Sequence, residues 1–368
     1  MKYRKTAAVL LALAMTASLA ACGTAKTATA SDDTATETPA AVTSTANAVT
    51  DVAAESTDLY TDRDLTQSPD LTDAKTLTVA DGDTLTVSDE GVYVLTGTAA
   101  NAQIVVEAPD DAKVQLVLDA LTVTNDDAPV IYVKNADKVF VTTASGTDNT
   151  LAVTGTFTAD GDTNTDAVIF SKDDLVLNGL GTLKIASTDN GVTSKDDLKV
   201  TGGTYAIDCA SHGLEANDGA YVCGGTLSIT AGECIEATCV RIDGGSLDLY
   251  GTDDGINAAY QSDDAAVPCI EITGGEISIT MAQGDTDALD SNGSLIISGG
   301  TVTISAQFAF DFVTGAEHTG GTITVNGETV DTITESMMMG GGMGGMQGGP
   351  GQMQGGMPGG MGGPGGRP

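Results

Sequence analysis

Polar side chains with metal-binding chemistry recur at two fixed places in the second half of the sequence. The segments can be aligned on their Gly-Gly pairs, and each segment then ends in a short third strand with one central apolar residue. One of the two places directly follows this apolar residue, and the other lies two positions before it. The first place holds Glu215, Glu236, Asn257, Asp290 and Asp311, and the second holds His212, Glu233, Asp254 and Asp287. Carboxylate and amide oxygens are the ligands that Ca²⁺ prefers, in a large and flexible shell. The spacing therefore points to calcium chemistry wherever successive segments stack.

Stacking such carboxylates carries an electrostatic cost. Neighbouring strands of a sheet lie about 4.8 Å apart, and two carboxylates at that distance repel by about 3 kcal/mol at an effective dielectric of about 20. Basic residues are too scarce to neutralise the column, since residues 180–326 contain only Lys184, Lys195, Lys199 and Arg241. A bound divalent cation is the simplest remedy. The alternative is that each aspartate is a solvated turn cap.

The predicted calcium ligands are concentrated in two neighbouring segments. Glu233 and Glu236 belong to the segment before these two, and Asp189 with Asn190 forms a poorer copy further upstream. The richest cluster consists of Asp253, Asp254, Asn257, Asp285, Asp287, Asp290 and Asn292.

The repeat that positions these residues is marked by Gly-Gly pairs. They begin at residues 202, 224, 244, 274, 299 and 320. A short strand-like run that alternates apolar and polar residues precedes each of the first five pairs, and another follows all six. Three short strands in roughly 22 residues describe one turn of a solenoid. Because parallel crossovers are nearly always right-handed, we predict an all-β, right-handed parallel β-helix.

Apolar residues in this alignment also fall into columns, which predicts a continuous inward ladder. One column contains Ile207, Ile229, Leu249, Ile279 and Ile304. A β-sandwich or jelly roll is the alternative, and it would be favoured by hairpin turns. The register from 75 to 170 is poorer than that from 172 to 326.

The two ends of the chain read differently from the repeats. Lys2, Arg4 and Lys5 precede an apolar run that ends in Leu-Ala-Ala-Cys22, which is typical of a secretory signal and resembles a lipobox. We therefore predict a signal peptide over 1–21 and a lipid anchor on Cys22; an ordinary signal peptide with a chance cysteine is the alternative. Domain bounds follow: a disordered Thr/Ala/Ser-rich stalk over 22–70, the solenoid over 71–336 and a disordered Met/Gly-rich tail over 337–368.

The amino-acid composition limits which kinds of molecule the protein can bind and which kinds of site it can contain. The formal net charge is −36, so nucleic acid and anionic lipid are excluded as partners and the only membrane contact predicted is through the lipid. The absence of Trp excludes sugar sites built on stacked indoles, and two histidines cannot make a three-histidine metal site. We predict a monomer that is extracytoplasmic, lipid-anchored to the cell membrane and surface-exposed.

Five cysteines remain beside Cys22, so at least one thiol is free or pairs between molecules. Cys239 and Cys269 each precede the first strand of adjacent repeats. They form either a disulfide or a reduced pair.

Several repeats resemble a known family. The sequences TDNGVTSKDDLKVTGG, GTDDGINAA and GDTDALDSNGSLIISGG, followed by a Met/Gly tail, are similar to the calcium-containing, carbohydrate-binding β-helix lipoproteins of clostridial relatives. The resemblance implies a pectate-lyase-like fold and binding of cellulose or polygalacturonate-type pectin. The chain departs from the pattern at His212-Gly213 and Glu233-Cys234, which puts metal at those two repeats in doubt.

Three functions stay open on this basis: polysaccharide binding without catalysis, a calcium-dependent lyase or hydrolase of pectin type, and a surface adhesin or spacer. A lyase needs a cationic base or clamp, and Arg241 is the only arginine in the solenoid. No second basic residue aligns with it. We therefore favour binding without catalysis.

Overall fold

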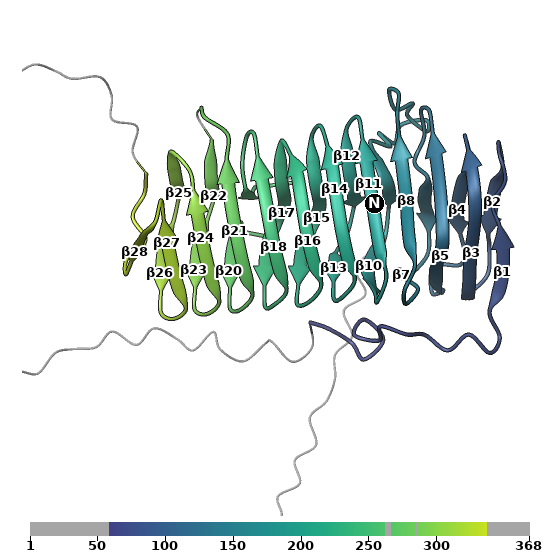
Figure 1. Ribbon diagram of the computed structural model, residues 1–368, viewed down its shortest axis with the longest axis horizontal. Coiled ribbons are helices and arrows are strands. Elements are labelled where there is room, and N and C mark those ends of the chain that lie inside the picture. The colour runs from purple at the N-terminus through teal and green to yellow at the C-terminus, as the bar shows by residue number, and fades with distance from the viewer. Residues whose placement is uncertain (1–58, 262–265, 285, 337–368) are drawn as a thin grey trace, which may run out of the picture. The chain divides into compact units, whose positions relative to one another are not determined.

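The computed structural model describes residues 59–261, 266–284 and 286–336, and these residues form a parallel β-solenoid (Figure 1). They contain 28 strands and no helix, and accordingly none of them lies in a helix suited to crossing a membrane. The predicted all-β parallel solenoid is confirmed, while its right-handed sense stays a prediction. The signal peptide, Cys22, the first part of the stalk, Asp285 and the Met/Gly tail lie outside the described residues.

Three parallel sheets run along the solenoid, and each rung between the two ends contributes one strand, or one half of a long strand, to each sheet. Four long strands, β3 (Gly91–Ala100), β5 (Lys113–Asn125), β15 (His212–Val222) and β17 (Glu233–Ile242), bend at a corner and serve two sheets. The first sheet contains the first halves of β3 and β5, the second halves of β15 and β17, and β1 (Lys75–Thr78), β7 (Lys138–Thr143), β10 (Asp174–Gly179), β13 (Leu198–Val200), β20 (Cys269–Ile272), β23 (Ser294–Ile297) and β26 (Gly315–His318). The second sheet contains the second halves of β3 and β5, with β8 (Asp148–Val153), β11 (Thr182–Ser187), β14 (Thr204–Cys209), β16 (Thr226–Ala231), β18 (Ser246–Gly251), β21 (Glu276–Met281), β24 (Thr301–Ser305) and β27 (Thr322–Val325). The third sheet contains the first halves of β15 and β17, with β2 (Thr84–Val87), β4 (Gln103–Glu107), β6 (Ile131–Asn135), β9 (Ala167–Ser171), β12 (Asn190–Ser194), β19 (Ile256–Ala258), β22 (Asp287–Ser291) and β25 (Phe308–Phe312).

The core lies between the three sheets and consists of the predicted apolar columns. Ile207, Ile229 and Leu249 are in direct register on β14, β16 and β18, and all three are buried. Strands of the second sheet alternate exposed and buried residues, as expected when one face packs inward and the other meets water. Burial of stacked β-branched and leucine side chains is the main stabilising contribution.

The Gly-Gly pairs lie at the turn from the first sheet to the second, and each glycine has its own reason. The second glycine adopts a positive φ, for example +91° at Gly225 and +92° at Gly245, which side chains disfavour. At every pair after the first, a Cβ on the first glycine would collide with a carbonyl of the preceding rung, such as Thr201 O beside Gly224, 2.6 Å away. At the first pair, a Cβ on Gly202 would collide with the Gln67 side chain. The repeat marker is thus a steric requirement of tight stacking.

The last rung is closed by an antiparallel turn. Strand β28 (Glu328–Val330) pairs with β27 in the antiparallel sense, and the Ser336 backbone N–H donates to Phe310 O on β25. These contacts cover strand edges that would otherwise offer unpaired backbone groups.

Residues 59–74, here called the strap, lie along the first sheet and lead to β1, as the purple segment beneath the strands in Figure 1 shows. The Asp64 carboxylate is fully buried, 3.6 Å from Lys138 Nζ and 3.9 Å from Lys199 Nζ. Gln67 hydrogen-bonds to the backbone of two rungs. The predicted end of the stalk at residue 70 is therefore too late. The strap is held by polar contacts, which a search for large apolar residues does not find.

Candidate metal centre on the third sheet

The polar columns predicted from the repeats exist on the outward side of the third sheet. Glu215, Glu236, Asn257, Asp290 and Asp311 follow one another in direct register from β15 to β25. The second column begins with His212 opposite Glu233 and continues through Asp254 and Asp287, which precede the paired residues of β19 and β22. We call these two columns the acidic face.

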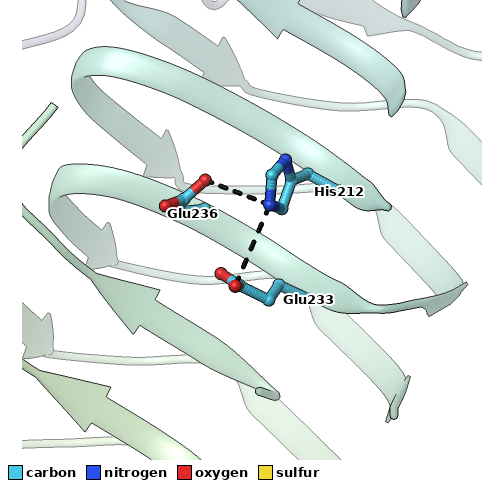
Figure 2. Close-up of side chains that lie close together, drawn as sticks. All are labelled: His212, Glu233 and Glu236. Atoms are coloured by element: carbon cyan, nitrogen blue, oxygen red, sulfur yellow. Dashed lines mark ion pairs between the residues drawn. The ribbon is translucent and has the colours of Figure 1, made fainter. Parts of the chain in front are cut away.

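His212, Glu233 and Glu236 form the tightest cluster on the acidic face. One ligand atom from each lies within 4.8 Å of the other two, and no other group of three His, Cys, Asp or Glu residues in the described part of the chain meets this criterion. His212 Nε2 is 3.3 Å from a Glu236 carboxylate oxygen and 3.9 Å from one of Glu233. Figure 2 shows both carboxylates turned toward one nitrogen of the ring. The register of β15 on β17 creates this meeting.

Neighbouring amides complete the surroundings of the cluster. Asn257 Nδ2 donates to Glu233 at 3.0 Å, and Gln261 Nε2 donates to Glu236 at 3.0 Å. Asn257 Oδ1 and His212 Nδ1 are buried atoms without a hydrogen-bond partner among the described residues. Because buried polar atoms are normally paired, the unpaired amide oxygen of Asn257, a residue whose Nδ2 contacts Glu233, indicates that a donor or cation is missing here.

Proton affinities on the acidic face are strongly perturbed. Burial, followed by repulsion from Glu236, raises the pKa of Glu233 to about 7. Burial, followed by repulsion from Asp254, Asp311 and Asp287, raises the pKa of Asp290 to about 7. The pKa of Asp254 rises to about 6, chiefly by burial. Each shift means that the ionised form is unfavourable without a counter-charge, so the face favours either protons or a cation.

The aspartates form a looser group than the histidine cluster. The Asp287 backbone N–H donates to Asp254 Oδ1 at 3.1 Å, which ties two adjacent rungs together. Asp290 and Asp311 lie next to each other in the outer column. This group supplies only oxygen ligands, which suits a hard cation.

Glu215 ends the acidic face on its N-terminal side and is neutralised by protein groups. Its carboxylate accepts hydrogen bonds from Asn190 Nδ2 and Thr193 Oγ1 at 2.7 Å and forms an ion pair with Lys195 at 3.0 Å. The amide oxygen of Asn190 accepts the His212 backbone N–H. Asn190 is therefore committed to holding Glu215 and the start of β15. Burial chiefly raises the pKa of the neighbouring Asp189.

The remaining predicted ligands lie further from the cluster. Asp253 is an exposed residue of the turn before β19, and Asn292 is exposed in the turn after β22. Asp285 lies outside the described residues. The structure thus gathers Glu233, Glu236 and Asn257 tightly.

His212 is the member of the cluster that the sequence prediction left out as a ligand. It replaces the usual acidic residue of this turn, and in the sequence alone this departure from the pattern counts against a metal ion at this repeat. Its position in register with Glu233 was the signal that could have identified it. Lys195 was counted only as a scarce base, although it directly neutralises Glu215.

The donor set fits a metal ion. Two carboxylates and an imidazole nitrogen face one another, and the histidine cluster is partly open, with side chains between 14% and 25% exposed. Such groups hold divalent ions in proteins. The acidic face therefore contains a group of side chains that could hold a metal ion.

The Cys239–Cys269 disulfide is present, which settles the choice between disulfide and reduced pair. It joins β17 to β20 at the base of the segment that carries Tyr260 and Gln261. Tyr260 is 55% exposed, and its neighbour Gln261 contacts the cluster. Cys209, Cys223 and Cys234 are free thiols, as the odd count required.

Arg241 lies on a different surface from the acidic face. Its guanidinium donates to Asp243 at 2.9 Å and to Glu271 at 2.6 Å, and its side chain belongs to the part of β17 in the first sheet. No lysine or arginine stands in either column of the acidic face.

Comparison with known proteins places the chain in a family. A model of the family described as carbohydrate-binding domain-containing protein matches residues 81–339, more than half of the chain. The chain belongs to this family. The matched region covers almost all of the solenoid and both columns of the acidic face, and it includes the cluster of His212, Glu233 and Glu236.

Two relatives agree with the resemblance seen in the sequence. A carbohydrate-binding domain-containing protein of Acetivibrio thermocellus is 36% identical over 124 residues, which make up 33% of this chain and 43% of the relative. The chain therefore matches less than half the length of that relative. The gadolinium derivative of a polysaccharide lyase-like protein from C. thermocellum is 25% identical with a TM-score of 0.50, and the match covers 68% of this chain and 94% of that chain. The family and the lyase-like β-helix fold are thus those that the repeats predicted.

Proposed function

We propose that this carbohydrate-binding domain protein is a monomeric, non-catalytic surface lipoprotein that binds a plant-type polysaccharide, cellulose or polygalacturonate, along its acidic face. The main support is the straight row of carboxylate and amide groups on five successive strands of one sheet. Groups repeated at the spacing of the rungs suit a long linear polymer better than a compact ligand. The exposed ring of Tyr260 beside the row offers an apolar surface for a sugar ring.

Calcium has a specific place in this proposal. With a net charge of −36, the protein repels an anionic uronate chain unless cations lie between them. Ca²⁺ held by Asp254, Asp287 and Asp290 would neutralise the face and share its open coordination positions with uronate carboxylates. Neutral cellulose needs no such bridge, so the two polysaccharides differ in their expected dependence on calcium.

Two observations favour binding over catalysis. A lyase of pectin type requires a cationic group beside the substrate, and Arg241 is engaged by Asp243 and Glu271 on another sheet. Lys195, the nearest lysine to the acidic face, is engaged by Glu215. Neither is available to take a proton next to a bound uronate.

The lipid anchor at Cys22 belongs to the same proposal. A lipidated cysteine followed by a polar segment would hold the solenoid outside the membrane, where polysaccharide is found. Cys22→Ala should release a soluble protein that still binds its ligand, measured by cell fractionation followed by pull-down.

The decisive experiment is a pull-down of the mature protein on insoluble cellulose and on polygalacturonate gel, with Ca²⁺ or with EDTA. Reducing-sugar and ultraviolet assays on the same samples detect hydrolase and lyase products. We expect binding to both polymers in Ca²⁺, loss of polygalacturonate binding in EDTA, and no product. Product formation would establish the enzyme alternative, and failure to bind either polymer would leave a surface adhesin or spacer.

A further inference from the structure

We propose that His212, Glu233 and Glu236 form a second metal site, separate from the calcium-binding aspartates, which prefers a borderline divalent transition-metal ion such as Zn²⁺ over Ca²⁺. This proposal does not depend on polysaccharide binding. It rests on the identity of the donor atoms and on their mutual distances. Both columns of the acidic face contribute to the site, and so do two adjacent rungs.

The donor atoms discriminate between ions. Ca²⁺ is bound by oxygen ligands, whereas an imidazole nitrogen with carboxylates suits Zn²⁺ and its neighbours. His212 contributes the one nitrogen ligand, and Glu233 and Glu236 contribute the two carboxylates. The aspartates further along the face offer oxygen alone. One surface therefore carries two donor sets of different preference.

The distances suit a small ion once the side chains close in by a few tenths of an ångström or more. A tetrahedral ion with bonds of about 2.1 Å separates its ligand atoms by about 3.4 Å. His212 Nε2 lies 3.3 Å and 3.9 Å from the two carboxylates, and the backbone pairing of β15 with β17 fixes the strands that carry them. The partial exposure of all three side chains leaves an outer position for water or for a sugar hydroxyl.

A simple ion pair is the competing explanation. A protonated His212 could neutralise one glutamate without any metal. That pairing still leaves a second carboxylate of the cluster without a cationic partner, as well as Asn257 Oδ1 without a donor. A divalent ion balances both carboxylates at once, which a single imidazolium does not.

Calorimetric titration of the mature protein with ZnCl₂ in saturating Ca²⁺ tests the proposal, together with Co²⁺ absorption spectra as a report on ligand type and geometry. We expect one Zn²⁺ per chain with unchanged Ca²⁺ binding, and a Co²⁺ spectrum of low coordination number. His212→Gln should weaken Zn²⁺ binding at least tenfold and leave Ca²⁺ binding unchanged. Asp290→Asn should weaken Ca²⁺ binding and leave Zn²⁺ binding unchanged.

Two further variants keep the result interpretable. Cys223→Ser tests whether the partly exposed free thiol supplies the zinc ligand, and it should bind as the parent does. Glu236→Gln provides a second route to the site if His212→Gln fails to fold, as judged by circular dichroism. Zinc binding that is absent, that is displaced fully by Ca²⁺, or that survives both His212→Gln and Glu236→Gln would overturn the proposal. Loss of polysaccharide binding with intact zinc binding would count against the proposed function alone.

Discussion

The outward side of the third sheet has two halves with the same backbone geometry. In the N-terminal half, here called the covered half, a loop lies over the outer column of side chains, whereas in the C-terminal half, here called the open half, that column is partly exposed. In the N-terminal half the outer column holds Tyr132 and Phe170, and it continues through Thr193 into Glu215. The two rings pack edge to face, 5.7 Å between centroids, and both are buried. The loop after β8 is tied down over them through Asp160, which accepts the Tyr132 hydroxyl. In the C-terminal half the same column is acidic and only partly buried.

This difference shows which residues are required for the fold and which positions tolerate different side chains. A column that accepts aromatic rings on some rungs and carboxylates on others is not what specifies the stack. The inward columns and the glycine turns, which are alike in both halves, do that. Burial, followed by mutual repulsion, raises the pKa of carboxyl groups such as Asp290 in the open half, so their ionised forms oppose folding. They are therefore best explained by a ligand.

The largest expected effect lies in the covered half. Phe170→Ala removes a fully buried ring and should lower the free energy of unfolding by about 3–5 kcal/mol. Calcium and zinc affinities should stay unchanged, because the ring lies outside the acidic face. Denaturant unfolding followed by circular dichroism measures the first quantity and calorimetry the second. Phe170→Leu is the matched control, with a smaller loss; equal loss for both variants would contradict a packing role.

The open half should respond to ligand where the covered half does not. Ca²⁺ at about one hundred times its dissociation constant should stabilise the protein by about 2.7 kcal/mol, if it binds the folded state alone. Thermal melts with Ca²⁺ and with EDTA show this directly. Asp290→Asn should lose most of the shift, whereas Phe170→Leu should keep it. An identical melting temperature in Ca²⁺ and in EDTA would mean that the folded protein does not bind Ca²⁺.

The next largest effect on the free energy of unfolding is expected at the boundary between the two halves, where Lys195 pairs with Glu215. Lys195→Met leaves the Glu215 carboxylate, which is 10% exposed, without its cation, and this should cost about 1–3 kcal/mol. Adding Glu215→Gln to that variant removes the unpaired charge and should restore most of the loss. Denaturant unfolding of the two variants tests the pair. If the double variant is no more stable than Lys195→Met, then Lys195 does not stabilise the protein by neutralising the Glu215 carboxylate.

Much of the fold was predictable because the repeats are periodic. A glycine recurs at the place of Gly225 in every aligned rung, and an aliphatic residue recurs at the place of Ile229. The structural roles of these two places could therefore be predicted from the alignment of the chain with itself. The strap was missed because Asp64 and Gln67 act on single rungs with no repeat to reveal them. His212 is hard to predict as a ligand for a related reason: it breaks the acidic pattern of its column, and only the register with Glu233 shows that it joins the cluster.

The smallest effect concerns pH, and it applies to the open half alone. Ordinary pKa values are about 4.3 for Glu and 3.9 for Asp, and those of Glu233 and Asp290 are raised to about 7. A raised carboxyl pKa means that the folded state holds its proton longer, so the stability of the metal-free protein is greatest below pH 4 for these groups and falls as the pH rises through 7. Solvent screening of these partly exposed groups limits the fall to on the order of 1 kcal/mol. Unfolding curves in EDTA between about pH 4 and about pH 7, the range bounded by the ordinary and the raised pKa values, should show the fall. Ca²⁺ should abolish it, and Asp290→Asn should reduce it. A slope that is equally steep with Ca²⁺ and with EDTA would mean that the cation does not bind where these carboxylates repel one another.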